Sequence, residues 1–181
     1  YTSDEPGITL NMNGTKILDT SKDQARENDL IYLTKPLGVG FLMSAFANNA
    51  KELSTSTYEK VLNNMLISNK KAYEISKYFN GKALTDISGF GLAAHLIDIC
   101  LNSDLTANLI LNEKIIIAES LRELKLFQSS AYEDNKESSI HHIKMMSEKN
   151  LDISNLSKIL FDPQTSGPLL ISISSDQRES F

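Results

Sequence analysis

The chain has 181 residues, of which 41% are hydrophobic and 23% are charged, and this balance is typical of a folded globular domain. The net charge of −5 at pH 7, with lysines and arginines scattered among acids, argues against a nucleic-acid partner. The apolar runs fall far short of the ~20 residues that cross a bilayer, and the single cysteine, Cys100, excludes an internal disulfide framework. The sequence does not open with the pattern of a signal peptide. We therefore expect a cytoplasmic protein that binds neither nucleic acid nor membrane.

Both ends of the sequence resemble the interior of a longer protein. There is no initiator methionine, and residues 1–7 read as a linker. Ser174 and Gln177 have the spacing of a capping box, which would begin a helix only about two turns before the last residue. These features predict a fragment that is truncated at its C-terminus.

The first half of the chain predicts two strands and two helices. Residues 8–12 alternate apolar and polar side chains, as a half-buried strand does, and residues 30–33 form a compact apolar run that suits a second strand. A segment rich in proline and glycine then leads into a helix from about Phe41. Residues 54–80 carry apolar side chains at i, i+3 and i+4 and predict one long helix.

The second half mixes helices and strands. Residues 90–101 are apolar on most sides and predict a buried helix, residues 105–111 alternate loosely as a strand, and residues 113–124 suit a helix. Residues 128–150 are polar and predict a loop and a helix at the surface, and residues 169–173 predict a strand. This irregular interleaving favours an α+β fold, a mixed β-sheet flanked by helices, over a doubly wound parallel sheet.

Residues 85–91 read Thr-Asp-Ile-Ser-Gly-Phe-Gly and lie between a short apolar stretch and the buried helix. Gly89 and Gly91 allow a tight turn that brings backbone N–H groups close to a ligand, and the N-terminus of the following helix suits phosphate. Asp86 adds a carboxylate, and Mg²⁺ bridges phosphates through one or two carboxylates. The pattern is consistent with a metal–nucleotide site, although the glycines could serve packing and Asp86 could cap the helix.

Residues 162–167 read Asp-Pro-Gln-Thr-Ser-Gly and concentrate turn-forming and hydroxyl side chains. One interpretation is a stiff polar turn that leads into a strand, with Asp162 bonding its own backbone. The other is a loop that docks on a neighbouring active-site turn.

Other residues with reactive side chains offer no site by their spacing. His95 has no second histidine or cysteine at ligand spacing, which favours a core histidine with satisfied hydrogen bonds. His141 and His142 are adjacent, so on a helix they point ~100° apart and cannot easily hold one metal ion. Cys100 has no basic neighbour and is expected to be an inert thiol. Ser166 has no base nearby in sequence.

Three motifs together resemble the selenophosphate synthetases (selenide, water dikinases), within the superfamily of aminoimidazole ribonucleotide synthetase. Residues 85–92, followed by Ala-His-Leu at 94–96, are similar to the Thr-Asp-Ile/Val-Thr/Ser-Gly-Phe-Gly-Leu and Gly-His-Leu signature of those enzymes. Residues 162–167 are similar to their Asp-Pro-Gln-Thr-Ser-Gly-Gly-Leu-Leu, and residues 33–40 to their Leu-Thr-Lys-Pro-Leu-Gly-Thr-Gly. The order and spread of the motifs indicate the C-terminal domain.

This resemblance implies an enzyme that converts selenide, ATP and water to selenophosphate, AMP and phosphate, using Mg²⁺. It also implies that an N-terminal domain carries the Cys or Sec nucleophile, a catalytic lysine, most Mg²⁺-binding aspartates and the homodimer interface. Residues 1–28 are expected to be the end of that domain and a linker. Residues 29–181 are expected to form the C-terminal domain, in a three-layer α/β/α-like arrangement.

The resemblance assigns Asp86 as a magnesium contact and the turn of Gly89, Phe90 and Gly91 as a part of the cofactor site that approaches the phosphates of ATP. It places no catalytic residue in this chain. Because one carboxylate makes a poor Mg²⁺ site, the isolated chain is expected to be inactive.

The sequence departs from the family pattern at two positions. Pro168 replaces the second glycine of the third motif, which fixes φ and removes an N–H, and Ala94 replaces the glycine before His95. Residues 128–150 are poorly matched. Two alternatives stay open: another ATP-dependent enzyme of the same superfamily, and a non-catalytic binding module with this fold.

Overall fold

A computed structural model describes residues 11–15, 20–48, 53–120, 127–144 and 156–178. Within this part, no helix is both long and apolar enough to pass through a membrane. The strand expected at residues 8–12 lies mainly outside the described residues, and residues 11 and 12 are not in a strand.

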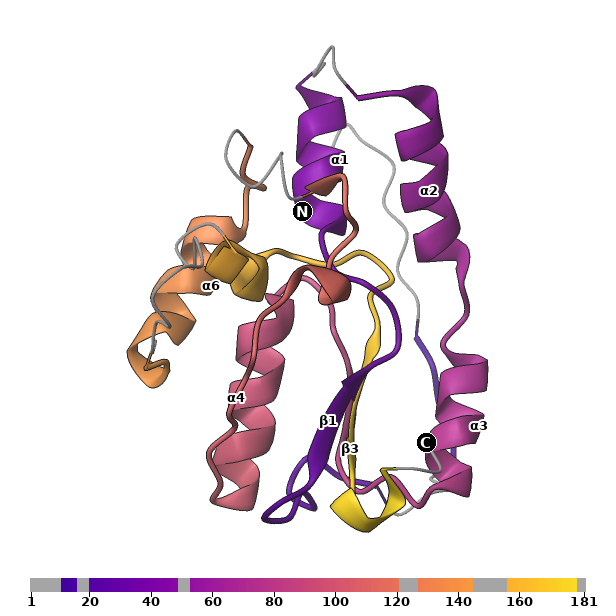
Figure 1. The fold of residues 1–181 in the computed structure, drawn as a ribbon, viewed down its shortest axis with the longest axis vertical. Coiled ribbons are helices and arrows are strands. Elements are labelled where there is room, and N and C mark those ends of the chain that lie inside the picture. Colours follow the sequence, from indigo (N-terminus) through magenta and orange to yellow (C-terminus); the bar gives the residue numbers. More distant parts are fainter. Residues whose placement is uncertain (1–10, 16–19, 49–52, 121–126, 145–155, 179–181) are drawn as a thin grey trace.

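The described strands form one small antiparallel sheet (Figure 1). The strands are β1 (Leu30–Leu33), β2 (Leu84–Asp86) and β3 (Leu169–Ile173), in the order β1-β3-β2. The central strand β3 is buried along its whole length, because both of its neighbours pair with it and helices cover both faces. The expected strands at 30–33 and 169–173 are confirmed.

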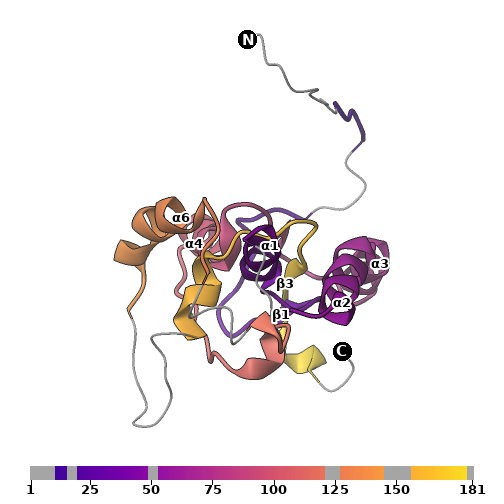
Figure 2. The same cartoon turned by 90° about the horizontal axis from the view of Figure 1, so that it is seen from above.

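Helices cover both faces of this sheet (Figures 1 and 2). The helices of the described residues are α1 (Val39–Ala47), α2 (Thr55–Leu66), α3 (Lys70–Tyr78), α4 (Gly91–Ser103) and α6 (Tyr132–Ser139), of which α3 and α4 lie beside the sheet and α1 and α2 beyond its end (Figure 1). Short 3₁₀ turns lie at Glu113–Ile115, Ile140–His142, Ser157–Phe161 and Ser175–Gln177.

Side chains of β3 alternate between the two layers of helices, as the period of a strand requires. Leu169, Ile171 and Ile173 pack with α3, whereas Leu170 joins the larger core beneath α4. The described residues thus form a helix–sheet–helix arrangement, and the α+β expectation is confirmed. The expected mixture of strand directions is not found in this sheet; a parallel pairing occurs only as an isolated bridge between Leu37 and Ile116 among the described residues.

The long helix expected at 54–80 is two helices, α2 and α3. The helix breaks between them because residues from distant segments form hydrogen bonds with polar groups at the junction. Ile67 is extended, with φ −63° and ψ 114°. The ammonium group of Lys35 donates to the carbonyl of Ile67 at 3.1 Å, and the side-chain amide of Asn69 donates to the carbonyl of Gly167 at 2.9 Å. The apolar periodicity continues across this break, so the sequence pattern gives no sign that the helix ends there.

The strand expected at 105–111 is absent: these residues are described, form no strand, and leave Ile110 87% exposed. Of the helix expected at 113–124, residues Glu113–Ile115 form a 3₁₀ turn, Ile116 is extended and bridges to Leu37, and only Ser120 is α-helical among the residues described. Three consecutive isoleucines, which favour extended backbone, explain this outcome. Residues 121–124 lie outside the described residues.

The helix expected at 90–101 is confirmed as α4, although Leu101 on it is 64% exposed. The polar segment 128–150 contains the expected helix, α6, but that helix is not purely superficial. Tyr132, Asn135 and Ser139 are buried against the core. Residues 145–150 lie outside the described residues.

Candidate functional site

The three sequence motifs meet at one end of the sheet, where β2 ends and β3 begins. Asp86 is paired with Leu169 in the antiparallel register, and the N–H of Ile87 donates to the carbonyl of Pro168 at 2.9 Å. The N–H of Gln164 donates to the carbonyl of Ser88 at 3.0 Å. The segment 162–167 is therefore a loop that leads into β3, as the first interpretation held, and that docks on the turn after β2; whether this turn is an active site stays a prediction.

The side chains of this docked loop cap helix α1 from a distance of more than 120 residues along the chain. Gln164 Oε1 accepts from the N–H groups of Gly38 at 3.2 Å and Val39 at 3.4 Å, and Asp162 Oδ2 accepts from Gly40 N–H at 3.1 Å. Gln164 Nε2 also donates to Asp162 Oδ2 at 2.7 Å. Because α1 has no local side-chain cap, these two residues satisfy N–H groups that the start of a helix leaves unpaired.

Close approach of the loop to α1 requires glycine at position 40. A Cβ atom there would lie 2.3 Å from Asp162 Oδ1 and 2.5 Å from the backbone oxygen of Pro163. We predict that Gly40→Ala lowers the free energy of unfolding by about 1–3 kcal/mol, because a backbone atom has to move to admit the methyl group. Thermal or urea unfolding of the chain measures the change. Gly89→Ala is the matched control, because no atom lies within 4 Å of its Cβ position, and equal losses in both variants would contradict the steric argument.

Asp162 is fully buried, and burial raises the pKa of its carboxyl group to about 8. Hydrogen bonds from Gln164, Gly40 and Phe41 act in the opposite direction but do not offset the loss of water. Asp162 Oδ1 has no hydrogen-bond partner among the described residues. Burial thus favours the neutral form of this carboxyl group in the docked loop.

Asp86 ends β2, and its side chain is exposed at the mouth of the turn. It does not cap α4: the N-cap residue of that helix is Phe90, and no side chain bonds to the first turn. The capping interpretation of Asp86 is therefore wrong, and its carboxylate lies free of the helix.

The two glycines of the turn have different surroundings. Gly89 is exposed and faces open space, and Phe90 is 65% exposed. Gly91 has φ +76°, and a Cβ atom there would lie 2.9 Å from the carbonyl oxygen of Leu160. Gly91 therefore serves backbone conformation and packing, whereas Gly89 leaves room for a ligand beside the start of α4.

Two further side chains fix the backbone around the site: Asn135 binds the turn, and Lys35, in the motif at 33–40, binds the docked loop. The side-chain amide of Asn135, on α6, donates to the carbonyls of Gly89 at 2.8 Å and Phe161 at 3.0 Å. Lys35 is 5% exposed, donates to the carbonyls of Ile67 and Ser166, and has its pKa lowered by burial. No local sequence signal marks these contacts, because each joins segments that lie more than 25 residues apart.

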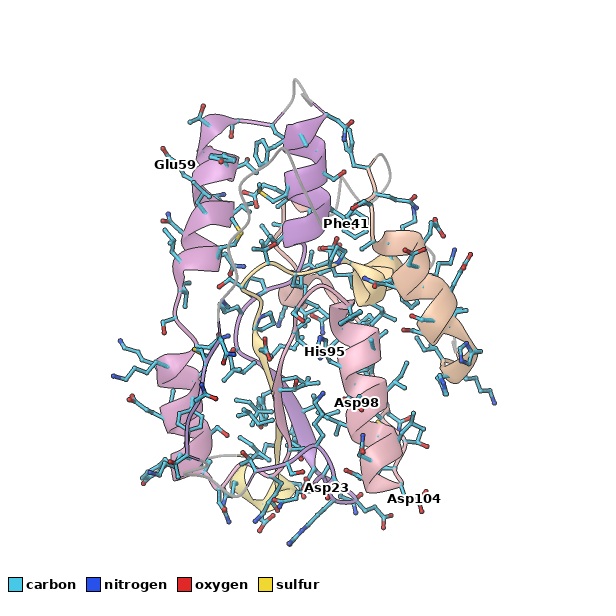
Figure 3. The ribbon with its side chains drawn as sticks, turned by 180° about the vertical axis from the view of Figure 1, so that it is seen from behind. Asp23, Phe41, Glu59, His95, Asp98 and Asp104 are labelled. Atoms are coloured by element: carbon cyan, nitrogen blue, oxygen red, sulfur yellow. The ribbon has the colours of Figure 1, made fainter. Side chains whose placement is uncertain are left out.

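His95 lies on α4 above Asp98 (Figure 3) and is half-buried, as expected for a histidine with satisfied bonds. Its Nε2 accepts from the backbone N–H of Ser88 at 3.2 Å. Burial lowers the pKa of His95 and the charge of Lys22 acts in the same direction, whereas the charges of Asp86 and Asp98 oppose the shift.

The remaining candidates carry no site. Burial raises the pKa of the Cys100 thiol, in keeping with an inert core cysteine. Among the described residues, no group of three or more His, Cys, Asp or Glu side chains could hold a metal ion. Within that part of the chain, Asp86 could therefore offer a magnesium ion a single carboxylate, which by itself makes a poor Mg²⁺ site.

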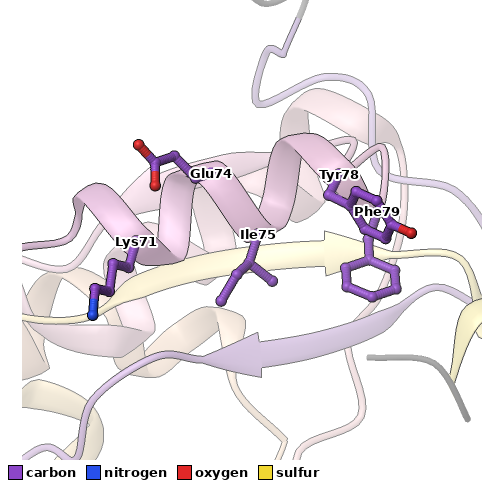
Figure 4. Close-up of a pocket in the computed structure, with 5 residues that line it drawn as sticks. All are labelled: Lys71, Glu74, Ile75, Tyr78 and Phe79. Carbon is purple, nitrogen blue, oxygen red and sulfur yellow. The ribbon is translucent and has the colours of Figure 1, made fainter.

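Two pockets open on the α3 side of the sheet, away from the turn at 86–91. One of about 400 Å³ is lined by Lys71, Glu74, Ile75, Tyr78 and Phe79 (Figure 4). The other, of about 350 Å³, lies between the β1 end and α3 and includes Lys35. Neither includes Asp86 or Gly89, so the candidate site is an open turn rather than an enclosed cavity.

Comparison with known proteins identifies relatives that agree with the family resemblance of the motifs. The family described as "AIR synthase related protein, C-terminal domain" matches residues 26–181. Selenide, water dikinases of Shewanella sp. (strain MR-7) and Shewanella baltica (strain OS155 / ATCC BAA-1091) are each 34% identical over 175 residues, 95% of this chain. That match covers 47% of each relative, so the chain spans about half the length of the curated relatives it matches.

Two solved structures share the fold at low sequence identity. Thiamine-monophosphate kinase from Stenotrophomonas maltophilia K279a superimposes with a TM-score of 0.56 at 20% identity, over 89% of this chain and 44% of that one. AaThiL complexed with AMPPCP and TMP gives a TM-score of 0.55 at 17% identity, over 87% and 43% of the two chains. With three motifs gathered at one end of the sheet and a family match over most of its length, the chain belongs to the AIR synthase-related C-terminal domain family.

Proposed function

We propose that this chain is the C-terminal domain of a selenophosphate synthetase, an enzyme that makes selenophosphate, AMP and phosphate from selenide, ATP and water. In this proposal residues 1–28 end the N-terminal domain and its linker, and residues 29–181 form the C-terminal domain. The N-terminal domain would supply the nucleophile, the other metal ligands and the homodimer interface. The 34% identity to selenide, water dikinases over nearly the whole chain supports this assignment.

The observation that carries the site is the exposed carboxylate of Asp86 beside an open glycine turn and an uncapped helix start. Asp86 would bind Mg²⁺ from one side, and Gly89 and Phe90 would approach the phosphates of ATP. The magnesium ion would neutralise negative charge on the phosphates. The chain's own contribution is to hold the carboxylate and backbone N–H groups of α4 in place.

A rival function has structural support, because a thiamine-monophosphate kinase shares this fold. It would be another ATP-dependent enzyme of the same superfamily with a different acceptor. Its fold similarity comes with 20% identity, against 34% for the selenide, water dikinases, so the acceptor proposed here is selenide.

The acceptor can be tested by the products that the full-length protein forms. We predict that ATP and Mg²⁺ yield AMP, phosphate and a selenium–phosphorus species by ³¹P NMR only when selenide is added. ADP formed with thiamine monophosphate in place of selenide would instead support the rival. If the protein turns over ATP with neither selenide nor thiamine monophosphate, the result would favour a non-catalytic binding module.

A further inference from the structure

We propose that His95 is a positioning residue that fixes the turn carrying Asp86 and Gly89, by accepting the backbone N–H of Ser88. This inference rests on the proposed function of the turn. It adds to that function a residue on α4 that touches neither the metal nor the nucleotide.

Ser88 lies midway between Asp86 and Gly91, and its backbone is held on both sides. Its N–H donates to His95 Nε2 at 3.2 Å. Its carbonyl accepts from the N–H of Gln164 at 3.0 Å and from the N–H of Gly91 at 3.1 Å. The two peptide units that flank Ser88 are therefore bound by the start of α4 and by the distant loop at 162–167, and His95 supplies the contact to the Ser88 N–H.

The direction of the bond defines the state of the ring. Because a backbone N–H can only donate, Nε2 of His95 has no proton, and the neutral ring carries its proton on Nδ1. The Ser88 hydroxyl, also 3.2 Å from Nε2, can then only donate to it. Burial, which lowers the pKa of His95, favours this neutral form.

The bond from Ser88 N–H to His95 matters to the site because the residues on either side of the buried Ile87 are exposed. Ile87 anchors the turn in the core, fully buried, but Asp86 and Gly89 on either side are exposed. Without the His95 bond, the N–H of Ser88 loses its acceptor within the described part of the chain, and the carboxylate two residues earlier is held less firmly. Groups that orient metal ligands from outside typically change metal affinity or activity about 10–100-fold when they are removed.

Three variants of the full-length protein separate this role from simple packing. His95→Leu keeps a side chain of similar size but removes the acceptor, whereas His95→Gln places an amide oxygen near the position of Nε2. Ser88→Ala removes the hydroxyl but keeps the backbone N–H. We expect His95→Leu to raise the Mg²⁺ concentration for half-maximal ATP turnover about 10–100-fold, and His95→Gln and Ser88→Ala to stay within about threefold of the natural protein.

A second readout does not depend on activity. Hydrogen exchange of the Ser88 amide, followed by NMR in the 181-residue chain, should be faster in His95→Leu and restored in His95→Gln. Equal exchange in both variants, or equal impairment of turnover in both, overturns the inference. If His95→Leu does not fold, His95→Asn replaces it, because its shorter side chain places the acceptor differently. If Asp86→Asn keeps normal Mg²⁺ dependence, the proposed metal role of Asp86 fails, while hydrogen exchange of the Ser88 amide still decides whether His95 holds the turn.

Discussion

Asp86→Ala in the full-length protein is expected to abolish selenide-dependent ATP turnover while leaving the fold unchanged. The carboxylate is exposed and makes no side-chain hydrogen bond within the described part of the chain, so its removal should change the free energy of unfolding by no more than about 0.5 kcal/mol. Turnover should fall at least about a hundredfold, the upper range seen for residues that act on a metal only indirectly.

The measurement is the rate of AMP formation as a function of Mg²⁺, together with the melting temperature of each variant. Asp134→Ala is the matched control, because Asp134 is an exposed aspartate on α6. It should leave both quantities unchanged. Near-normal turnover in Asp86→Ala would remove the metal role, and a large drop in its melting temperature would show that Asp86 is structural.

Asp86→Asn refines the result, since asparagine keeps the shape and an oxygen ligand but loses the charge. If magnesium binding depends on the charge, Asn should be nearly as impaired as Ala. Recovery of turnover at high Mg²⁺ in Asn but not in Ala would indicate that the oxygen itself contacts the ion.

The strands at 30–33 and 169–173 and the helix from residue 91 were predictable from sequence because their patterns are local. A run of apolar side chains bounded by turn residues defines a buried strand, and the all-buried β3 has this pattern. The motifs at 85–91 and 162–167 were also recognisable from sequence, and the resemblance they carried was correct at the level of the family.

Features decided by long-range contacts were not predictable. The break between α2 and α3 occurs where Lys35 and Gly167 bind the junction, although the apolar period of the helix continues through it. Likewise, nothing near Asn135 in sequence indicates that its side chain binds Gly89. In the site itself, sequence singled out Asp86 and the glycines, while the contacts that fix them come from segments far away in the chain.

The docked loop at 162–167 carries a family motif, and its side chains also have a structural role at the start of α1. Asp162 and Gln164 face α1, not the exposed turn, and together they satisfy N–H groups at its start. Pro168, the departure from the family pattern, still offers its carbonyl to Ile87 at 2.9 Å. The loop therefore keeps its docking contact with the turn despite the proline.

Asp162→Asn is expected to remove a pH dependence of stability that the natural chain shows between about pH 4 and pH 8. The folded chain has this carboxyl group with a pKa of about 8, above the ordinary value of 3.8 that applies when the chain is unfolded. Between these values the folded state holds a proton that the unfolded state has lost. Stability therefore falls as the pH rises through this window and levels off above pH 8.

The loss is at most several kcal/mol, since each pKa unit corresponds to about 1.4 kcal/mol. Asparagine is neutral at every pH and can accept from Gly40 N–H with its side-chain oxygen, so the advantage of the variant over the natural chain should be smallest near pH 4 and largest near pH 9. Asp162→Ala should be less stable than Asp162→Asn by roughly 2–4 kcal/mol at every pH, because it leaves buried N–H groups unpaired.

Urea unfolding of the natural chain and both variants from pH 4.5 to pH 9 measures these differences. Asp98 and Glu119 do not confuse the result: hydrogen bonds from Lys22 and Lys60 lower the pKa of each, so their contribution is lost below about pH 4. The difference between the natural chain and Asp162→Asn isolates the single group. A constant difference across the pH range would mean that Asp162 is ionised in the folded chain, and that its bonds to the start of α1 outweigh its burial.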